Sequence, residues 1–288
     1  MAKINIVGDT HDVPALRRIL SRLDKVYSLG DIVAVDTQDY LKNVSRYSKV
    51  WKAHAAEDLT TVTEEEIKWY HDINVDGWEK QLKMISESGK NLTVVRGNSD
   101  LRMLNFFPEM REALQKATGS NPKFDFVEQL TYKTIDNVCI IFLPYRDDTY
   151  EEIDSVINNI TGEFKKLFVL GHCPLYPDHE KQYYIHHFNA VKLISEVLGE
   201  LTYFHGHVHA YKTYKYNRPE LSKVTIITPK AEDCDEGMGF NHEYLEIDTN
   251  SGEIIIKKID TQAESIFVTP PLEYLAGDHW NSYIKPKT

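Results

Sequence analysis

Short hydrophobic runs that end in a glycine and a polar residue recur along this chain. They constrain its fold more than any other feature. Each run has the length and the β-branched or aromatic content of a buried strand, and helical patterns separate several of them. Strands that alternate with helices predict an α/β core. The predicted strands are 4–7, 26–29, 92–95, 138–143, 167–170 and 201–204, and the predicted helices are 13–23, 151–164 and 190–198.

The later part of the chain is predicted to be rich in strands. Its expected strands are 224–227, 243–247 and 253–259, and Asn250-Ser251-Gly252 is typical of a hairpin turn between the last two.

Two segments look like additions to this core. Residues 37–89 form a long connection with helical patterns at 40–54 and 64–86, which we interpret as a helical insertion or cap. The tail from residue 261 contains Pro270-Pro271, and we expect it to wrap the surface or to meet another subunit. We therefore predict one domain over residues 1–260, which includes the insertion 37–89, followed by a C-terminal tail over residues 261–288.

Metal-capable side chains follow the predicted strands, mostly directly after a glycine. The carboxyl ends of strands are where α/β sheets bind ligands, and glycine lets the backbone approach a small charged object. The i,i+2 pairs point to one side of an extended chain, so each pair can offer two ligands to one volume. The candidates are Asp9 and His11 after the first strand, Asp31 after the second, Asn98 after the third, His172 after the strand at 167–170, and His207 and His209 after the strand at 201–204.

These seven candidates suit a pair of transition-metal ions. Carboxylate, imidazole and amide donors in this mixture favour Mn, Fe, Zn, Ni or Co, and they suit Ca poorly. If two ions bind, one carboxylate has to be shared, and Asp31 is the natural bridge. Two dications against two carboxylates and a hydroxide leave a charge of about +1, which attracts a phosphate oxyanion.

The ordered motifs Asp-x-His, Gly-Asp, Gly-Asn, Gly-His and Gly-His-x-His, between Gly8 and His209, resemble the calcineurin-like metallophosphoesterase superfamily. The resemblance implies an α/β fold, a four-layer α/β/β/α sandwich of two mixed sheets. It implies two-metal hydrolysis of a phosphate ester, in which a bridging hydroxide attacks phosphorus. Of the candidate ions, we favour manganese. The implied ligands are Asp9, His11 and His209 on the first metal, Asn98, His172 and His207 on the second, and Asp31 between them.

Ser99 departs from the family pattern. Many members carry a histidine directly after Gly-Asn, which contacts the phosphate and can protonate the leaving group. Serine there resembles a prokaryotic branch with cysteine in this place, whose members are often phosphodiesterases, so a phosphodiester or nucleotide-type substrate is expected. Asp31, Asn98 and Ser99 are then the predicted catalytic residues. Serine is a poor general acid, so we hypothesise that a histidine supplies the proton. The candidates are His54, His71, His179, His186 and His187.

The net charge and the cysteine content limit the expected partners and the expected location of the protein. A net charge of −11 without a basic stripe makes nucleic acid an improbable partner and leaves a small phosphate ester as the expected substrate. No apolar run is long enough to span a membrane. The three widely spaced cysteines argue against disulfides, so we expect a cytoplasmic location. A homo-oligomer formed through the tail is an open prediction.

Alternatives remain at this stage. A phosphomonoesterase, including a protein phosphatase, fits the same ligands, whereas a nuclease is disfavoured by charge. A metal-free scaffold is the alternative from another class, because a retromer subunit resembles this fold. Ala34 stands where purple acid phosphatases carry a tyrosine ligand, which excludes that subclass. Arg102 and Arg146 can bind a phosphate or pair with nearby aspartates, and His205 is expected to pack beneath the ligand strand.

Overall fold

The structure is a computed structural model that describes residues 3–10, 13–32, 43–56, 58–146, 152–175, 182–207, 212–216, 218–229, 243–258 and 273–274. The helices are α1 (Val13–Arg22), α3 (Val44–Ala55), η1 (Leu59–Thr61), α4 (Glu64–Ser88), α5 (Asn98–Phe106), α6 (Pro108–Ser120), α7 (Ile153–Asn159), α8 (Gln182–Leu198) and η2 (Pro219–Leu221). The strands are β1 (Lys3–Val7), β2 (Lys25–Ser28), β3 (Asn91–Val95), β4 (Phe124–Val127), β5 (Thr131–Ile135), β6 (Val138–Leu143), β7 (Lys166–Gly171), β8 (Leu201–Phe204), β9 (Lys212–Tyr216), β10 (Val224–Thr228), β11 (Glu243–Asp248), β12 (Ile254–Lys258) and β13 (Glu273–Tyr274).

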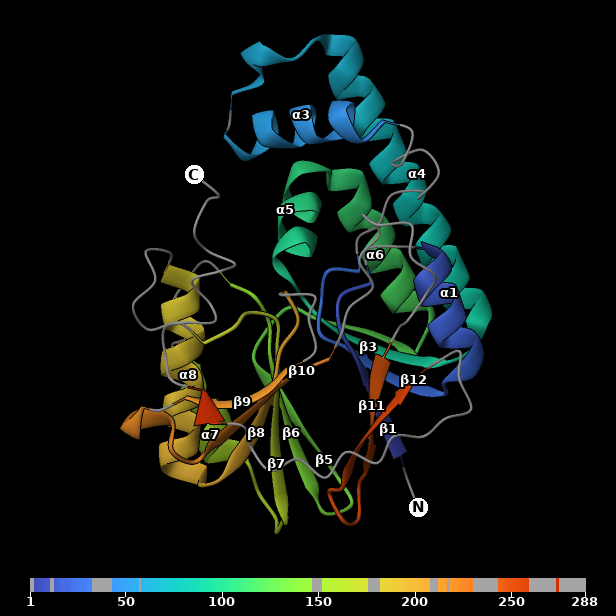
Figure 1. Cartoon of the computed structure of the whole chain (residues 1–288). Coiled ribbons are helices and arrows are strands. Elements are labelled where there is room, and N and C mark those ends of the chain that lie inside the picture. Colours follow the sequence, from blue (N-terminus) through green and yellow to red (C-terminus); the bar gives the residue numbers. More distant parts are fainter. Residues whose placement is uncertain are drawn as a thin grey trace.

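Two mixed sheets face each other in the middle of the molecule (Figure 1). Within the described residues, one sheet has the strand order β12-β11-β1-β2-β3-β4, and the other has β13-β9-β10-β8-β7-β6-β5. In the first sheet β1, β2, β3 and β4 are parallel. In the second, β6, β7, β8 and β10 are parallel. Parallel strands carry their carboxyl ends to one edge, so each sheet gathers its strand ends on one side.

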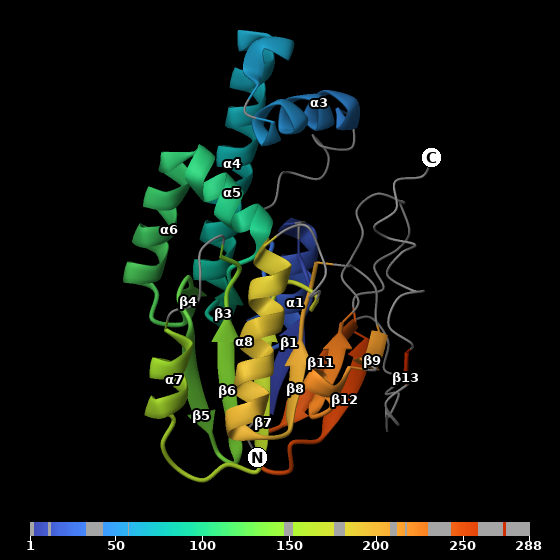
Figure 2. The same cartoon turned by 90° about the vertical axis from the view of Figure 1, so that its left-hand side faces the viewer.

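Alternating side chains divide the core into layers. In β6, Val138, Ile140 and Phe142 pack between the two sheets. The intervening residues Cys139 and Ile141 pack against α7 and α8 on the outer face, as the two-residue period of a strand dictates. On the far side, α1, α4, α5 and α6 cover the first sheet (Figure 2). The predicted four-layer α/β/β/α sandwich is confirmed.

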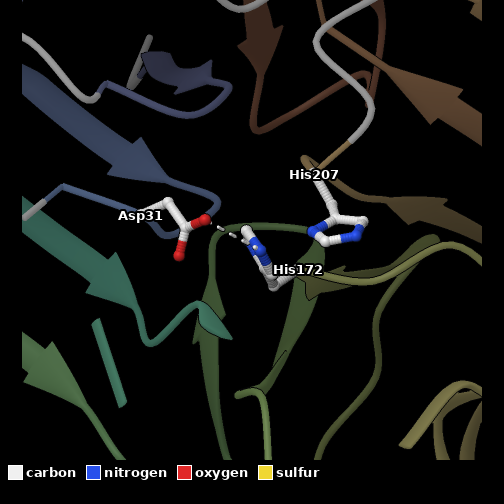
Figure 3. Close-up of side chains that lie close together, drawn as sticks. All are labelled: Asp31, His172 and His207. Atoms are coloured by element: carbon white, nitrogen blue, oxygen red, sulfur yellow. Dashed lines mark ion pairs between the residues drawn. The ribbon is translucent and has the colours of Figure 1, made fainter. Parts of the chain in front are cut away.

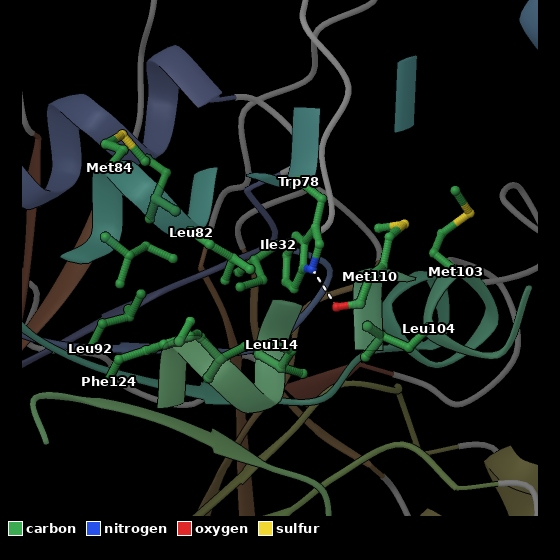
Figure 4. Packing of buried hydrophobic residues seen from close by; sticks show 14 of the residues in the cluster. Ile32, Trp78, Leu82, Met84, Leu92, Met103, Leu104, Met110, Leu114 and Phe124 are labelled. Carbon is green, nitrogen blue, oxygen red and sulfur yellow. Dashed lines mark hydrogen bonds between the residues drawn. The ribbon is translucent and has the colours of Figure 1, made fainter. Parts of the chain in front are cut away.

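Helix α4 lies within the predicted insertion and packs its second half into this outer layer. It begins with a capping box in which Thr63 and Glu66 bond reciprocally, and it ends at Gly89 in the left-handed conformation, with φ of 63°. Its second half is core: Trp78 is buried and donates through Nε1 to the Met110 carbonyl of α6 at 2.8 Å (Figure 4). Its first half and α3 extend beyond the sheet, next to α5 (Figure 1).

Several elements differ from the predictions. Strands β4, β5 and β9 and helices α5 and α6 were not predicted, and α7 is shorter than the predicted 151–164. Helix α8 begins at Gln182 rather than at residue 190. The predicted start is too late because Tyr184 and His187 look polar in the sequence, although both are buried in the first turns of the helix. No described helix has the length and apolar content of a membrane span. The predicted boundary at residue 260 and nearly all of the tail lie outside the described residues, so the domain limits stay predictions.

Candidate metal centre

The ligand candidates follow strands of both sheets. Asp9, Asp31 and Asn98 come just after the neighbouring parallel strands β1, β2 and β3. His172 and His207 come after the neighbouring parallel strands β7 and β8 of the other sheet. Two groups of strand ends therefore meet where the sheets adjoin. His11 and His209 lie outside the described residues, so their positions stay predictions.

Unusual backbone conformations mark two of these turns. Only three non-glycine residues of the described part have positive φ, and two of them are Asp31 (49°) and His207 (68°). Such angles are uncommon outside glycine and concentrate at functional sites. The preceding Gly30 has φ of 105°, and a Cβ there would lie 2.7 Å from the Val95 carbonyl oxygen of β3. The Gly-Asp motif is thus required by the close approach of two strand ends.

Four side chains converge on one point. The Asn98 Oδ1 atom lies 2.7 Å from His172 Nε2 and 2.8 Å from His207 Nδ1. The Asp31 carboxylate is 3.4 Å from His172 Nε2, and Figure 3 shows Asp31, His172 and His207 gathered together. One donor atom from each of these three residues lies within 4.8 Å of the other two. Together with Asn98, these are the residues that the family resemblance implies for a second metal and its bridge.

The spacing of these donors fits a metal ion. Donors bound to one ion at about 2.1 Å are separated by about 3.0–3.4 Å in octahedral or tetrahedral geometry. The observed 2.7–2.8 Å therefore requires the three groups to open by less than about 1 Å. The opposite nitrogen of His172, Nδ1, donates to the Leu29 carbonyl at 2.8 Å, so Nε2 is the nitrogen that would coordinate an ion.

Two buried carboxylates give the site its charge. Asp9 is fully buried, and its oxygens accept the His207 backbone N–H at 2.9 and 3.1 Å. Asp31 is only 3% exposed. Burial by itself lowers the pKa of His172, but the carboxylates of Asp31 and Asp9 outweigh burial and raise that pKa to about 10. A buried pair of carboxylates needs positive charge beside it, which dications supply.

Ser99 contacts Asp31. Its backbone N–H donates to Asp31 Oδ1 at 2.8 Å, and its hydroxyl donates to Oδ2 at 2.9 Å. A Cβ on the preceding Gly97 would lie 2.2 Å from Asp31 Oδ1, so only glycine leaves room for this contact. The Gly-Asn-Ser motif therefore holds the predicted bridging carboxylate at both oxygens.

Asp100 is a site residue that the sequence reasoning missed. It is completely buried, and its Oδ2 accepts the backbone N–H groups of Asp31 at 2.8 Å and Gly97 at 2.9 Å, while Oδ1 accepts that of Ile32 at 2.9 Å. One carboxylate thus ties together the turns after β2 and β3. Its position three residues after Gly97, in the first turn of α5, matches a helix-capping pattern that could have identified it.

Tyr184 is a second residue that was missed. Its hydroxyl lies 2.9 Å from His207 Nε2. It belongs to the first turns of α8, where no motif or spacing in the sequence links it to His207, so only the fold reveals the contact.

The remaining histidine candidates have other surroundings. His54 packs against Tyr70 and Phe106, and burial lowers its pKa. His71 lies within ion-pair distance of Asp72 and Glu109. His187 is buried beside Tyr145, whereas His186 is half-buried. His179 lies outside the described residues.

Three further predictions concern single residues. His205 is buried beneath the ligand turn, where its Nδ1 donates to the Gly206 carbonyl and the Thr228 hydroxyl donates to Nε2. Burial lowers its pKa to about 3, so it is a neutral packing residue. Arg146 pairs with Glu152. Arg102 lies over the ring of Trp51, 4.9 Å from its centroid.

A four-layer sandwich whose strand ends gather carboxylate, amide and imidazole groups defines a metallophosphoesterase-type protein. The family model for calcineurin-like phosphoesterases matches residues 2–211. The chain belongs to this family, whose members use divalent metal ions. No curated relative matches the sequence.

Solved structures also resemble the chain. One aligns with a TM-score of 0.53 at 14% identity and covers 90% of this chain and 99% of its own; at that identity it shows the fold alone. A protein of Thermus thermophilus aligns with a TM-score of 0.49 at 11% identity, covering 89% of this chain and 98% of its own. A metallophosphoesterase from Sphaerobacter thermophilus aligns with a TM-score of 0.33 at 13% identity, covering 91% and 90%.

Proposed function

We propose that this protein is a dinuclear metal-dependent phosphoesterase that hydrolyses a phosphodiester or nucleotide-type substrate. The observation that carries the proposal is the convergence of Asn98 Oδ1 on His172 Nε2 and His207 Nδ1 at 2.7 and 2.8 Å. These three side chains would hold one ion. Asp9, with His11 and His209, would hold the other, and Asp31 would bridge them.

When bound, the two dications supply Lewis-acid chemistry: they activate a water for attack on phosphorus and neutralise charge on the phosphate. The side chains of this protein hold the reacting groups in place. Ser99 fixes the Asp31 carboxylate through two hydrogen bonds. Asp9 fixes the turn that carries His207. The mixed nitrogen and oxygen donors suit Mn, Fe, Zn, Ni and Co, and among these ions we favour manganese.

The choice of a diester or nucleotide rests on two features. The first is Ser99, because serine at this position resembles the prokaryotic branch with cysteine there, whose members are often phosphodiesterases. The second is Trp51 on α3, which is 37% exposed and is the only aromatic side chain among the exposed large hydrophobic residues of the described part. Its partner Arg102 lies one helical turn beyond Asn98 on α5. An exposed indole beside a guanidinium offers a surface for a base and a phosphate.

Proton donation to the leaving group is a separate question. His186 and His187 are on α8, the helix whose Tyr184 contacts His207, so we favour them over His54 and His71. Replacing each with alanine and measuring kcat on an ester with a poor leaving group tests this hypothesis. Unchanged rates in both variants would exclude His186 and His187 as the proton donor.

Two alternatives remain within the same fold. A phosphomonoesterase or protein phosphatase would use the same donors, and a metal-free scaffold would use none. The cytoplasmic location and an oligomer through the tail stay predictions from the sequence.

A direct test compares bis(4-nitrophenyl) phosphate with 4-nitrophenyl phosphate in the presence of Mn²⁺, because the leaving group is the same. The wild type should prefer the diester, and Asp31→Asn should lower the rate by at least about 100-fold. Asp125→Asn, the same change at an exposed position of β4, is the control. A preference for the monoester would favour the phosphatase alternative. Fewer than about one ion per chain after reconstitution would favour the scaffold.

A further inference from the structure

The two ring nitrogens of His207 have different neighbours. Nδ1 lies 2.8 Å from Asn98 Oδ1, and Asn98 Oδ1 also lies 2.7 Å from His172 Nε2. Nε2 points the other way and lies 2.9 Å from the Tyr184 hydroxyl. Nδ1 is therefore the nitrogen that faces the candidate ion, and Nε2 is the nitrogen that faces the protein.

This arrangement fixes which nitrogen must carry the proton when an ion is bound. An imidazole coordinates through an unprotonated nitrogen, so coordination through Nδ1 places the single proton on Nε2. That N–H then needs an acceptor, and ligating histidines almost always have one. The phenol oxygen of Tyr184 accepts hydrogen bonds as well as donating them, so it meets this need.

Resting on the proposed function, we propose that Tyr184 is a positioning residue of the metal centre. It accepts the Nε2–H of His207 and thereby presents Nδ1 to the ion shared with Asn98 and His172.

The surroundings of Tyr184 hold its hydroxyl in place. Its side chain is 8% exposed and packs in a small apolar cluster with Tyr145 and Cys173, against which Leu101 packs. Cys173 directly follows His172, and Leu101 belongs to α5, the helix that begins at Asn98. The cluster therefore joins α8 to the segments that carry the other two ligands. A packed ring with few alternative rotamers fixes a hydrogen bond better than a mobile one.

The test is a pair of matched phenol-to-phenyl substitutions in the full chain. Tyr184→Phe keeps the packed ring and removes only the hydroxyl. Tyr47→Phe removes a comparable hydroxyl that bonds to Asn74 Oδ1 at 3.1 Å between α3 and α4, away from the ligand turns. Metal-free protein is titrated with Mn²⁺ by calorimetry, which reports the affinity of each ion without any substrate.

Tyr184→Phe should weaken one of the two ions by about 10–100-fold, as loss of a ligand's outer hydrogen bond typically does. The other ion should change by less than about threefold. Tyr47→Phe should leave both affinities unchanged. Equal, wild-type affinities in Tyr184→Phe would overturn the proposal.

A spectroscopic measurement on the wild type does not depend on any variant. In ¹⁵N-labelled, zinc-loaded protein, the His207 imidazole should carry its proton on Nε2 and exchange it slowly with water. A proton on Nδ1 would overturn the inference. If the wild type binds no metal, the proposed function fails and this inference fails with it. If it binds two ions but hydrolyses no phosphoester, only the proposed function fails.

Discussion

Replacing Asp100 with asparagine should loosen the turn that carries Asp31. The carboxylate accepts three backbone N–H groups, two at Oδ2 and one at Oδ1. An asparagine has one acceptor oxygen. The asparagine amide can be placed in two orientations. In the more favourable one, its oxygen takes the Oδ2 position and keeps the two bonds there, and its NH₂ group faces the N–H of Ile32.

The size of the effect follows from these contacts. One hydrogen bond to a charged acceptor is lost, which costs about 1.5–3 kcal/mol, and one buried N–H is left without an acceptor, which costs about 1–3 kcal/mol. The two terms overlap because they concern the same donor, and removing a buried charge offsets part of them. We expect the free energy of unfolding of metal-free protein to fall by about 2–4 kcal/mol.

Urea denaturation of metal-free protein measures this change, and an Mn²⁺ titration of the same sample measures its effect on the site. Asp100→Asn should shift the midpoint with an unchanged slope and should weaken metal binding, because the Asp31 turn keeps only one of its two bonds to this side chain. Asp125→Asn makes the same chemical change on the exposed face of β4 and should stay within about 0.5 kcal/mol of wild type. An Asp100→Asn protein with wild-type stability and wild-type metal affinity would refute the reasoning.

Three further predictions use the same chain. Gly206→Ala places a Cβ 2.0 Å from Asp9 Oδ1 and should destabilise the protein by about 1–3 kcal/mol in urea denaturation. The matched control is Gly119→Ala in helix α6, where the added Cβ would meet nothing within 4 Å, and this change should stabilise the protein by about 0.4–1 kcal/mol. If both substitutions changed the free energy of unfolding in the same direction, the close packing at the Gly-His motif would be contradicted. Trp51→Ala should raise KM for a nucleotide substrate about 5–150-fold while leaving KM for a diester without a base unchanged, and equal effects on both would remove the base-stacking role. His172→Ala should lower the metal content measured by elemental analysis from about two ions per chain to about one, whereas a content that stays at two would exclude this residue as a ligand.

The strands that lead to the site, and the turns that follow them, were predictable because local rules determine them. The unbroken apolar run from Val138 to Leu143 already indicates a strand that is buried on both faces. Gly30, directly before Asp31, likewise indicates a turn in which a larger side chain would not fit. These features depend on a few neighbouring residues, and the structure has them where the sequence placed them.

What escaped prediction depends on contacts between distant segments. The first turns of α8 carry Tyr184 and His187, polar in appearance but buried by the neighbouring Tyr145 and Cys173, so no apolar period marks the helix start. Helix α6 begins at Pro108, directly after the buried Phe107, and such a run can be taken for a loop. The partner of His207 could not be inferred, because the fold alone brings α8 to that turn.

The candidate metal centre is also a set of links between the two sheets. His172, after a strand of the second sheet, donates to the Leu29 carbonyl of the first. Asp9, after a strand of the first sheet, accepts the His207 N–H of the second. Arg96 and Tyr145 repeat the pattern, since the Tyr145 N–H donates to the Arg96 carbonyl at 2.7 Å and the Arg96 guanidinium donates back to the Tyr145 carbonyl.

Because donors from both sheets would share an ion, the separation of the sheets sets the separation of the donors. The apolar layer between the sheets, which includes Ile140, Phe168 and Phe204, fixes that separation. Interiors of this kind are close-packed and resist displacement. The distances at the site therefore depend on the side chains that fill the space between the sheets, and we expect a change of volume in that layer to alter metal affinity without changing a ligand.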